Sequence, residues 1–406
     1  MRMNGTEAQV YNRMLVLATL RNCAGRSRAN IARLTGLSPT ATTNIVNDLL
    51  DEGLLLETEK AKQEGRGRKG RMVAVNPNYA MAIGVEVTDR QLYAVLVDFA
   101  EQPVHVISRD VYQADASDLL NIIVAAVTEL QTAIPRATKR PGVCLAVQGA
   151  SLNFPVSKGW RLETLAGAVE ERVGMPVYAQ VRMLAATTAE LRYGYGRDVT
   201  DFVYFNSAAG SGFGIGIVAD GRLVRGIQGF SGQFGHLCVK PDGPQCYCGG
   251  RGCLAAIAAP NAILTGIRRA IDSGVETSLA NIDRDSLQFS DVVDAAKNGD
   301  KLSIYTLENV GEALGLGFSY VINMLNPQLV VLSGVLAQAG DLLMLPIIRA
   351  TRLHTVPALY KQVQFVLSEL NEYGGARGAV ACLMDRFFDY GTAQATGNGL
   401  RTHLTK

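Results

Sequence analysis

The chain has 406 residues, 48% of them hydrophobic, and a formal net charge of only +2 at pH 7. A chain of this length is too long to fold around one ordinary hydrophobic core, so two or three domains are expected. No charged segment followed by an apolar run opens the chain, and no apolar stretch approaches the roughly 20 residues that a transmembrane helix needs. Together with the odd number of cysteines, seven, these features argue against a secreted or membrane protein and favour a cytoplasmic one.

The near-neutral total hides an uneven distribution of charge. Residues 1–75 contain 12 Lys or Arg against 7 Asp or Glu, which gives a net charge of +5. The remaining residues contain 27 against 30, a net charge of −3. A basic head therefore precedes an acidic body.

Three helices are predicted in the head. Apolar residues recur at helical spacing from Ala8 to Leu20, and again after Ser27, which is a candidate N-cap. The third helix begins at Ser38-Pro39, because a serine cap followed by proline at the first helical position is a strong start signal, and it extends to Gly53.

The turn at residues 35–37 contains a glycine, so the second and third helices have the arrangement of a helix-turn-helix, whose second helix enters the major groove of DNA. The exposed side of that helix is expected to carry small hydroxyl and amide side chains that can contact phosphates or base edges, with asparagine suited to adenine. These candidate DNA-binding residues are Thr40, Thr42, Thr43, Asn44 and Asn47. The pattern alone is equally compatible with a solvated face of a small helical bundle.

Two strand-like runs, Leu54–Leu56 and Met72–Val75, flank a basic glycine-rich segment that extends from Gly65 to Arg71. This order predicts a winged hairpin whose cations contact phosphates or enter a narrow minor groove. The candidate wing residues are Arg66, Arg68 and Lys69. The alternative is a solvated linker before the next domain.

Beyond residue 75 the pattern mixes hairpins with helical crossovers, which indicates an α/β body. Strands are expected at 82–87, 92–97, 143–147 and 177–181, with helices at 117–134 and 183–193. The alternation restarts near residue 202, with strands at 202–205, 213–218 and 329–332 and helices at 254–271 and 302–325. Two similar halves with a cleft between them are implied. The run from Gly210 to Gly216 is either a phosphate-cradling loop or a glycine-rich hairpin with close backbone approach.

The segment from residue 236 to residue 253 contains one of the four histidines and four of the seven cysteines. Zinc takes four nitrogen or sulfur ligands in a tetrahedron, and a turn rich in glycine could gather one imidazole and three thiolates. The predicted ligands are His236, Cys246, Cys248 and Cys253, which leaves Cys238 spare. Four protein ligands leave no open position for water, so this zinc would be structural. The alternative is a set of buried cysteines without a ligand role.

These motifs resemble the ROK family, named for repressors, open reading frames and kinases, over residues from about Gln9 to Phe388. The segment 226–236 is similar to the family's glycine-spaced ExGH segment, and 246–254 is similar to its CxCGxxGCLE zinc motif. The segment 326–334 resembles its late strand motif. The match is greatest to the repressor branch, typified by the glucose-phosphotransferase regulator and the N-acetylglucosamine and xylose repressors.

The resemblance implies an N-terminal winged helix-turn-helix followed by a two-lobed actin/hexokinase-like body with the sugar in the cleft. It also implies a homodimer or homotetramer that binds paired half-sites of double-stranded operator DNA. On this basis residues 1–75 form the DNA-binding domain, 76–195 the first lobe, 196–390 the second lobe with the zinc site, and 391–406 a polar tail.

Two departures from the family indicate that kinase chemistry is lost. Val181-Arg182 aligns with the Asn-Asp pair that supplies the kinases' general base, and a guanidinium cannot remove a proton. The segment from Glu86 to Arg90 replaces the first phosphate motif without its glycines. Phosphoryl transfer needs both the sugar hydroxyl and the nucleotide phosphate to be positioned, and the motifs for both are altered here.

The resemblance also places the candidate ligand-binding residues, which are Asn153, Gln233 and His236. Gln233 replaces the glutamate of ExGH and can still hydrogen-bond a sugar hydroxyl, whereas Ala255 replaces a second family glutamate and cannot. The favoured interpretation is a repressor of carbohydrate-related genes with a sugar-sensing body. The alternatives are an active sugar kinase with an accessory DNA-binding head, and a body that docks another protein.

Overall fold

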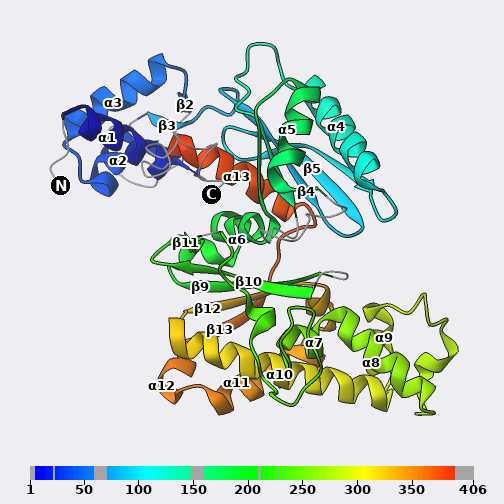
Figure 1. Ribbon diagram of the computed structural model, residues 1–406. Helices are drawn as coiled ribbons and strands as arrows, with labels where there is room; N and C mark the ends of the chain where they lie inside the picture. The colour runs from blue at the N-terminus through cyan, green and yellow to red at the C-terminus, as the bar shows by residue number, and fades with distance from the viewer. Residues whose placement is uncertain are drawn as a thin grey trace.

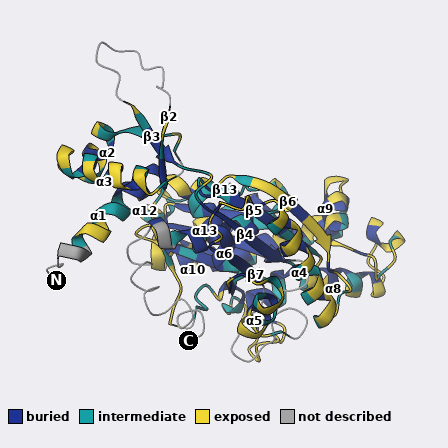
Figure 2. Ribbon diagram, turned by 90° about the horizontal axis from the view of Figure 1, so that it is seen from above, coloured by how far each residue is buried: buried dark blue, intermediate teal, exposed yellow. Residues whose placement is uncertain are grey.

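The computed structural model describes residues 5–21, 23–58, 71–147, 160–208, 212–227 and 229–388. These residues form a small head and two α/β lobes, each lobe built on its own sheet (Figure 1). Figure 2 shows the buried strands at the centre of the body and exposed residues along the helices of the head. Within the described residues, no helix combines the length and the apolar character needed to cross a bilayer.

The head contains the three predicted helices and a three-stranded antiparallel sheet of order β1-β3-β2. Its elements are α1 (Gly5–Leu20), β1 (Arg26–Ser27), α2 (Arg28–Thr35), α3 (Pro39–Asp51), β2 (Leu55–Thr58) and β3 (Met72–Val75). The hydroxyls of Ser27 and Ser38 accept the amides of Asn30 and Ala41, each at 3.2 Å, so both predicted caps are confirmed. Gly36 ends α2 with a φ of 70°, which glycine adopts without steric cost.

The first lobe has a five-stranded sheet of order β6-β5-β4-β7-β8. Its elements are β4 (Met81–Val87), β5 (Gln91–Asp98), β6 (Pro103–Asp110), α4 (Ala116–Thr132), β7 (Val143–Val147), α5 (Leu162–Val173), β8 (Val177–Val181) and α6 (Arg182–Tyr193). Helices α4 and α5 pack on one face of the sheet. Alternate residues of β4 point to the opposite face, as the period of a strand requires.

The second lobe repeats this topology in the order β11-β10-β9-β12-β13. Its strands are β9 (Phe202–Ala208), β10 (Gly212–Ala219), β11 (Arg222–Val224), β12 (Leu329–Gly334) and β13 (Gln364–Leu367). Its helices are α7 (Leu254–Ala258), α8 (Pro260–Asp272), α9 (Phe289–Lys297), α10 (Lys301–Leu325), α11 (Asp341–His354) and α12 (Pro357–Tyr360). Short 3-10 helices are η2 (Tyr195–Asp198), η3 (Phe234–His236), η4 (Ser278–Asn281) and η5 (Val335–Ala339).

Each sheet therefore has three antiparallel strands followed by two parallel ones, which confirms the predicted repeat and the α/β class. The prediction of a single helix at 254–271 is wrong, because this segment forms two helices, α7 and α8. Ala259 has a ψ of 145° and separates α7 from α8, because the residue before a proline is disfavoured in the helical region.

The glycine-rich run that starts at Gly210 contributes to a hairpin. From Gly212 onward it forms β10, which pairs antiparallel with β9. A Cβ on Gly216 would lie 1.7 Å from Oγ1 of Thr187 on α6, so the strand approaches that helix closely. This arrangement favours the hairpin interpretation; residues 209–211 lie outside the described part of the chain.

The last helix, α13 (Gly374–Phe388), corrects the predicted lobe boundaries. The range 196–390 places it in the second lobe, yet it packs on the sheet of the first lobe and against α6 (Figure 1). A Cβ on Gly84 of β4 would lie 2.0 Å from the carbonyl oxygen of Ala376, so strand and helix touch at the backbone. Head, first sheet and α13 also share one hydrophobic core, which includes Leu20, Phe99 and Met384. The head is therefore packed firmly onto the first lobe.

Candidate nucleic-acid interface and metal centre

The third helix presents four of its five predicted DNA-binding side chains outward. Thr40, Asn44 and Asn47 are exposed and Thr43 is half-buried. Thr42 is fully buried, and its hydroxyl donates to the carbonyl oxygen of Ser38 at 3.0 Å. The prediction that Thr42 faces the groove is wrong, because residues 42, 46 and 49 form the buried stripe of α3.

Arg28, at the first position of α2, connects the recognition helix to the base of the wing. Its guanidinium donates to Oδ1 of Asn47 at 3.2 Å and to Oε1 of Glu57 on β2 at 3.2 Å. Arg71 donates to the other oxygen of Glu57 at 2.6 Å. Hydrogen bonds from Arg71, and then from Arg28, lower the pKa of the Glu57 carboxyl. With its oxygen engaged, Asn47 offers its amide donors to a partner. Sequence reasoning missed this pairing, which joins residues 19 positions apart.

The strands on either side of the predicted wing tip are present. β2 and β3 pair antiparallel, with Thr58 opposite Met72, so the intervening segment connects two paired strands. This pairing favours a hairpin over a linker. The wing residues Arg66, Arg68 and Lys69 lie outside the described residues, and their role stays a prediction.

The four predicted metal ligands come together. The candidate ligand atoms of His236, Cys246, Cys248 and Cys253 all lie within 4.8 Å of one another, with the Sγ atoms of Cys248 and Cys253 3.7 Å apart. A Zn–S bond of about 2.3 Å gives a tetrahedron an S–S edge of about 3.8 Å, so the spacing fits that ion. Cys238 is exposed and is not part of the cluster, as predicted.

A tight backbone turn brings the cysteines together. The amide of Cys246 donates to the carbonyl oxygen of Gly250 at 2.8 Å. Gly252 has a φ of 66°, and a Cβ there would lie 1.6 Å from the carbonyl oxygen of Lys240. Only glycine fits this position, which explains why the cysteines are interleaved with glycines.

The electrostatics of the bare cluster favour a cation. Burial, and then the neighbouring thiols of Cys248 and Cys246, raise the pKa of Cys253 to about 12. The pKa of Cys248 is lowered, chiefly by the amide of Gly250. Three adjacent thiols cannot all ionise without a compensating positive charge, and a divalent metal supplies that charge. The donor set of three sulfurs and one imidazole suits zinc.

His236 uses its two ring nitrogens differently. Nδ1 lies 3.7 Å from Sγ of Cys246 and faces the thiols, while Nε2 lies 3.1 Å from the hydroxyl oxygen of Tyr247. Burial lowers the pKa of His236, which favours the neutral imidazole that a metal requires. Tyr247, between two cysteines of the motif, is a partner that sequence reasoning missed.

The candidate sugar-binding residues are only partly placed. Gln233 is exposed next to His236, and its amide donates to the carbonyl oxygen of Phe230 at 3.3 Å. Ala255 is buried against the cysteines. Asn153 lies outside the described residues. Ligand binding by Asn153, Gln233 and His236 stays a prediction.

Between the two sheets, Arg182 forms what we call the inter-lobe triad with Glu86 and Asn206. Nη1 of Arg182 lies 3.3 Å from Oε1 of Glu86 on β4, and Nη2 donates to Oδ1 of Asn206 on β9 at 2.9 Å. Glu86 also accepts the backbone amides of Gly375 and Ala376. Burial raises the pKa of Glu86, although the arginine and the amides oppose this rise. The two residues that depart from the kinase pattern are therefore paired with each other.

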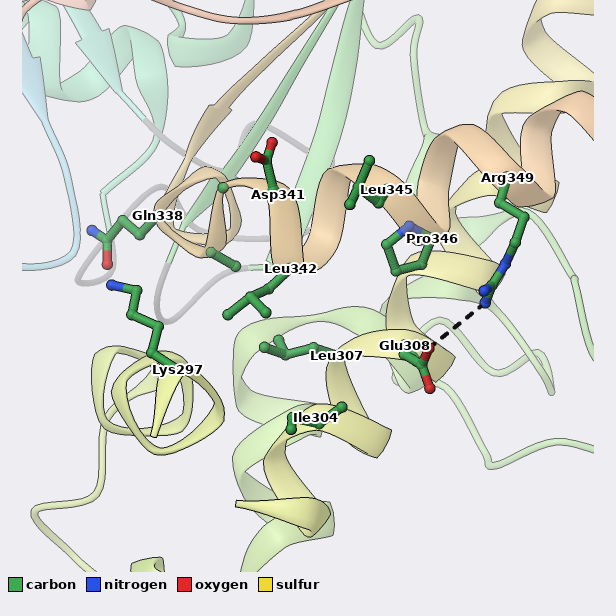
Figure 3. Close-up of a pocket in the computed structure, with 12 residues that line it drawn as sticks. Lys297, Ile304, Leu307, Glu308, Gln338, Asp341, Leu342, Leu345, Pro346 and Arg349 are labelled. Atoms are coloured by element: carbon green, nitrogen blue, oxygen red, sulfur yellow. Dashed lines mark ion pairs between the residues drawn. The ribbon is translucent and has the colours of Figure 1, made fainter. Parts of the chain in front are cut away.

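A pocket of about 760 Å³ lies elsewhere, within the second lobe between α10 and the segment from η5 to α11 (Figure 3). Apolar side chains such as Leu307, Leu342 and Leu345 line it, and Arg349 at one end lies 3.9 Å from Glu308. Neither Gln233 nor His236 is among its lining residues, so this pocket is distinct from the predicted sugar site.

Comparison with known proteins agrees with this architecture. Residues 82–386 match the ROK family, and residues 11–55 match a winged helix-turn-helix DNA-binding family. The xylose repressor of Caldicellulosiruptor bescii is 25% identical over 397 residues, which cover 95% of this chain and 98% of that protein. The DNA-binding transcriptional repressor Mlc of Escherichia coli is 26% identical over 361 residues, covering 87% and 88%.

Among solved structures, a ROK family transcriptional regulator described as a homologue of E. coli Mlc superposes with a TM-score of 0.80. The superposition covers 97% of this chain and all of that chain, at 24% identity. The likeness includes the head as well as both lobes.

Proposed function

Because this chain belongs to the ROK family and carries an N-terminal winged helix-turn-helix, we propose that it is a DNA-binding transcriptional repressor of carbohydrate-related genes in the cytoplasm. The observation that carries the proposal is the exposed polar face of α3 beside a β-hairpin, on a body whose relatives are named sugar repressors. Phosphate contacts would position the head and base-edge contacts would specify the site.

In this proposal Thr40, Thr43, Asn44 and Asn47 face the major groove. Arg66, Arg68 and Lys69 of the wing contact the backbone or the minor groove. Two heads of a homodimer or homotetramer would bind paired half-sites about one helical turn apart or a multiple of it.

The body would not be an enzyme. Arg182 has no basic lone pair to accept a proton at neutral pH, and its pairing with Glu86 neutralises the one carboxylate of the inter-lobe triad. The proposed zinc would serve as a structural cross-link between His236 and the three cysteines. The same segment would line a sugar site through Gln233 and His236, with Asn153 from the first lobe.

Selection of binding sites from random DNA, with the full chain and a panel of hexoses, pentoses and N-acetylhexosamines, tests the proposal. We expect an enriched paired site and a sugar that weakens its binding. A coupled ATP-consumption assay over the same panel tests the kinase alternative. Enrichment of no DNA sequence, or turnover on any sugar, would contradict the proposed function.

A further inference from the structure

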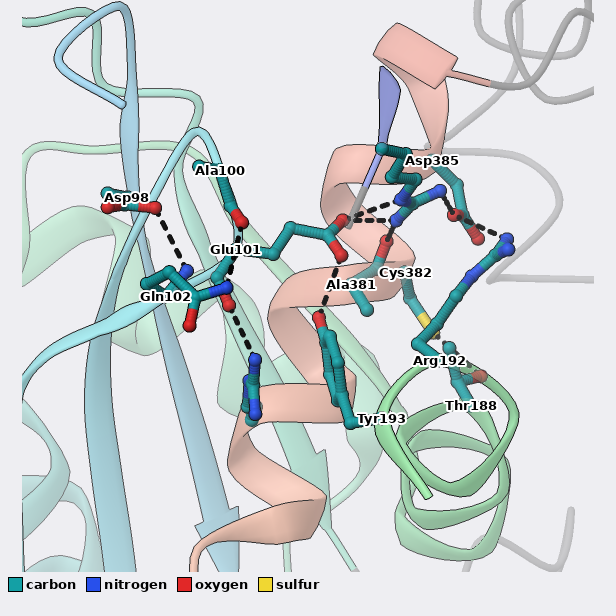
Figure 4. A network of polar contacts seen from close by, with 12 residues as sticks. Asp98, Ala100, Glu101, Gln102, Thr188, Arg192, Tyr193, Ala381, Cys382 and Asp385 are labelled. Carbon is teal, nitrogen blue, oxygen red and sulfur yellow. Dashed lines mark hydrogen bonds and ion pairs between the residues drawn. The ribbon is translucent and has the colours of Figure 1, made fainter. Parts of the chain in front are cut away.

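A cluster of buried charges joins the head to the body. Arg21 directly follows α1, and its guanidinium lies between Glu101, in the turn from β5 to β6, and Asp385 of α13. Its Nε donates to Glu101 at 2.8 Å and its Nη1 to Asp385 at 2.6 Å. The side chains of Arg21 and Glu101 are only 6% and 1% exposed. Figure 4 shows Glu101 and Asp385 facing each other from these two elements, with Tyr193 below. We call these four residues the Arg21 junction.

Glu101 adopts an unusual backbone conformation to take part. Its φ is 62°, in the left-handed region that favours glycine or asparagine, yet a fully buried glutamate occupies it. Tyr193 donates its hydroxyl to the second carboxylate oxygen at 3.1 Å, and Arg377 donates to the backbone carbonyl at 2.8 Å. These partners hold the turn and keep the carboxylate of Glu101 directed at Arg21.

The shared core fixes the head at the same place. The ring of Phe388 lies 4.7 Å below the guanidinium of Arg21, and Leu20 belongs to the same core as Met384 and Phe388. A buried guanidinium that loses its carboxylate partners leaves its charge uncompensated, which is strongly unfavourable. Few orientations of the head on the body therefore satisfy Arg21.

Two helices lead from this junction to the inter-lobe triad. α6 begins with Arg182 at the triad and ends with Tyr193 at the junction. α13 begins where the amides of Gly375 and Ala376 contact Glu86, and it carries Asp385 near its end. At 12 and 15 residues they are about 18 and 22 Å long, so each spans the distance between the two clusters.

The two helices are packed closely enough to move together. A Cβ on Gly378 of α13 would lie 2.0 Å from the carbonyl oxygen of Ala185 on α6, so the helices touch at the backbone. Near the junction the thiol of Cys382 donates to the hydroxyl of Thr188 at 3.3 Å, and Arg192 donates to Asp385 at 3.1 Å. Through these contacts, a shift of either helix end at the triad would also move Asp385 or Tyr193.

We propose that the Arg21 junction couples the inter-lobe triad to the DNA-binding head, with α6 and α13 as the connecting element. The inference rests on the proposed function, since it assigns how DNA binding is regulated. Arg182 and Glu86 belong to the first lobe and Asn206 to the second, so a change in the relative position of the lobes must stretch or break the hydrogen bond from Arg182 to Asn206. The resulting shift of α6 or α13 would move Tyr193 or Asp385 relative to Arg21 and turn the head, which alters how paired heads fit paired half-sites.

A double-mutant cycle on the full chain tests the coupling. The triad variant Glu86→Gln/Arg182→Met removes both charges together, so neither is left buried alone. The junction variant Arg21→Met/Glu101→Gln does the same at the other end and leaves Asp385 paired with Arg192. We expect the triad variant to change affinity for the selected operator about tenfold in the otherwise unaltered protein, and less than about twofold in the junction variant.

Arg13→Met is the matched control. Arg13 lies on α1, which ends just before Arg21, and pairs with Glu52 at 2.6 and 2.8 Å, but Glu52 belongs to the head itself. In the Arg13→Met background the triad variant should keep its full effect on operator affinity.

A milder variant is available if the junction variant does not fold. Tyr193→Phe removes only the hydroxyl that donates to Glu101, and it should reduce the effect of the triad variant on operator affinity in part. Additive effects, or a triad variant without effect on affinity, would overturn the proposal.

Amide hydrogen exchange provides a measurement that does not depend on DNA. The triad variant should raise exchange at residues 16–21 and 380–388, far from the substitutions, and leave exchange in α4 unchanged. Unchanged exchange at both segments would overturn the coupling even if DNA binding is confirmed. If the protein binds no DNA but the triad variant still raises exchange at both segments, the proposed function is contradicted while the coupling between triad and head is supported.

Discussion

The cluster of His236 with three cysteines and the exposed polar face of α3 are built in opposite ways. The cluster gathers four side chains within one short segment, and a turn with a left-handed Gly252 leaves them little freedom. The polar face of α3 spreads its side chains along an exposed helix, where Asn47 is held by one contact from Arg28. Substitutions in the cluster should therefore affect folding, whereas substitutions on α3 should affect DNA binding and leave stability nearly unchanged.

The largest effect is expected from loss of a metal ligand. Cys248→Ser should abolish stoichiometric zinc and lower the free energy of unfolding by at least about 3 kcal/mol, because metal binding contributes directly to folding. Elemental analysis and thermal unfolding check this outcome. Cys238→Ser is the control, since Cys238 lies outside the cluster. Full zinc content and full stability in Cys248→Ser would rule out the site.

The glycine turn should be nearly as sensitive. Gly252→Ala places a Cβ against the carbonyl oxygen of Lys240 and strains a positive φ, so we expect a loss of about 2–5 kcal/mol together with weaker zinc binding. Gly274→Ala is matched, because Gly274 also has a positive φ but faces open space. It should lose only about 1–2 kcal/mol. Equal losses of unfolding free energy in Gly252→Ala and Gly274→Ala, measured by chemical denaturation, would show that the close contact with Lys240 does not contribute.

Asn47→Ala tests the other side of the comparison. Loss of a base-edge contact should weaken operator binding by about 1–3 kcal/mol and relax preference at one position of each half-site. The melting temperature should stay close to that of the unaltered protein, because Asn47 is exposed. Fluorescence anisotropy with the selected operator measures affinity, and Asn78→Ala, an exposed asparagine outside α3, is the control. If Asn47→Ala instead caused a large loss of stability, the face of α3 would not differ from the cysteine cluster in its importance for folding.

The same contrast explains what the sequence could predict. The four predicted metal ligands lie within 18 residues, so spacing alone predicts that they come together, and the Ser38-Pro39 start of α3 is equally local. Residue type alone predicts an exposed Thr42, but a threonine can donate its hydroxyl to a backbone carbonyl one turn earlier and so lie in the core. The pairs of Arg21 with Glu101 and Asp385 join residues 80 and 364 positions apart. Local periodicity carries no signal for such contacts, nor for the return of α13 to the first lobe.

Arg28→Met should have the smallest effect on affinity and the most specific effect on base preference. Arg28 engages Oδ1 of Asn47, so Asn47 presents donors and should prefer a base acceptor such as purine N7 or guanine O6. Methionine frees the oxygen, and the amide can then contact adenine through both N6 and N7. We expect affinity to fall less than about fivefold while repeated site selection shifts toward adenine at the position that Asn47→Ala relaxes.

Salt dependence separates this role from a phosphate contact. If Arg28 left Asn47 to bind a DNA phosphate, Arg28→Met would lower the slope of log affinity against log salt by about 0.9 and leave base preference unchanged. Arg13→Met removes an equivalent ion pair elsewhere in the head and should alter neither quantity. Glu57→Gln provides an intermediate test, because it removes the carboxylate that holds Arg28 while keeping the guanidinium. A shift toward adenine in Glu57→Gln, smaller than in Arg28→Met, would show that the ion pair at the base of the wing sets how α3 reads DNA.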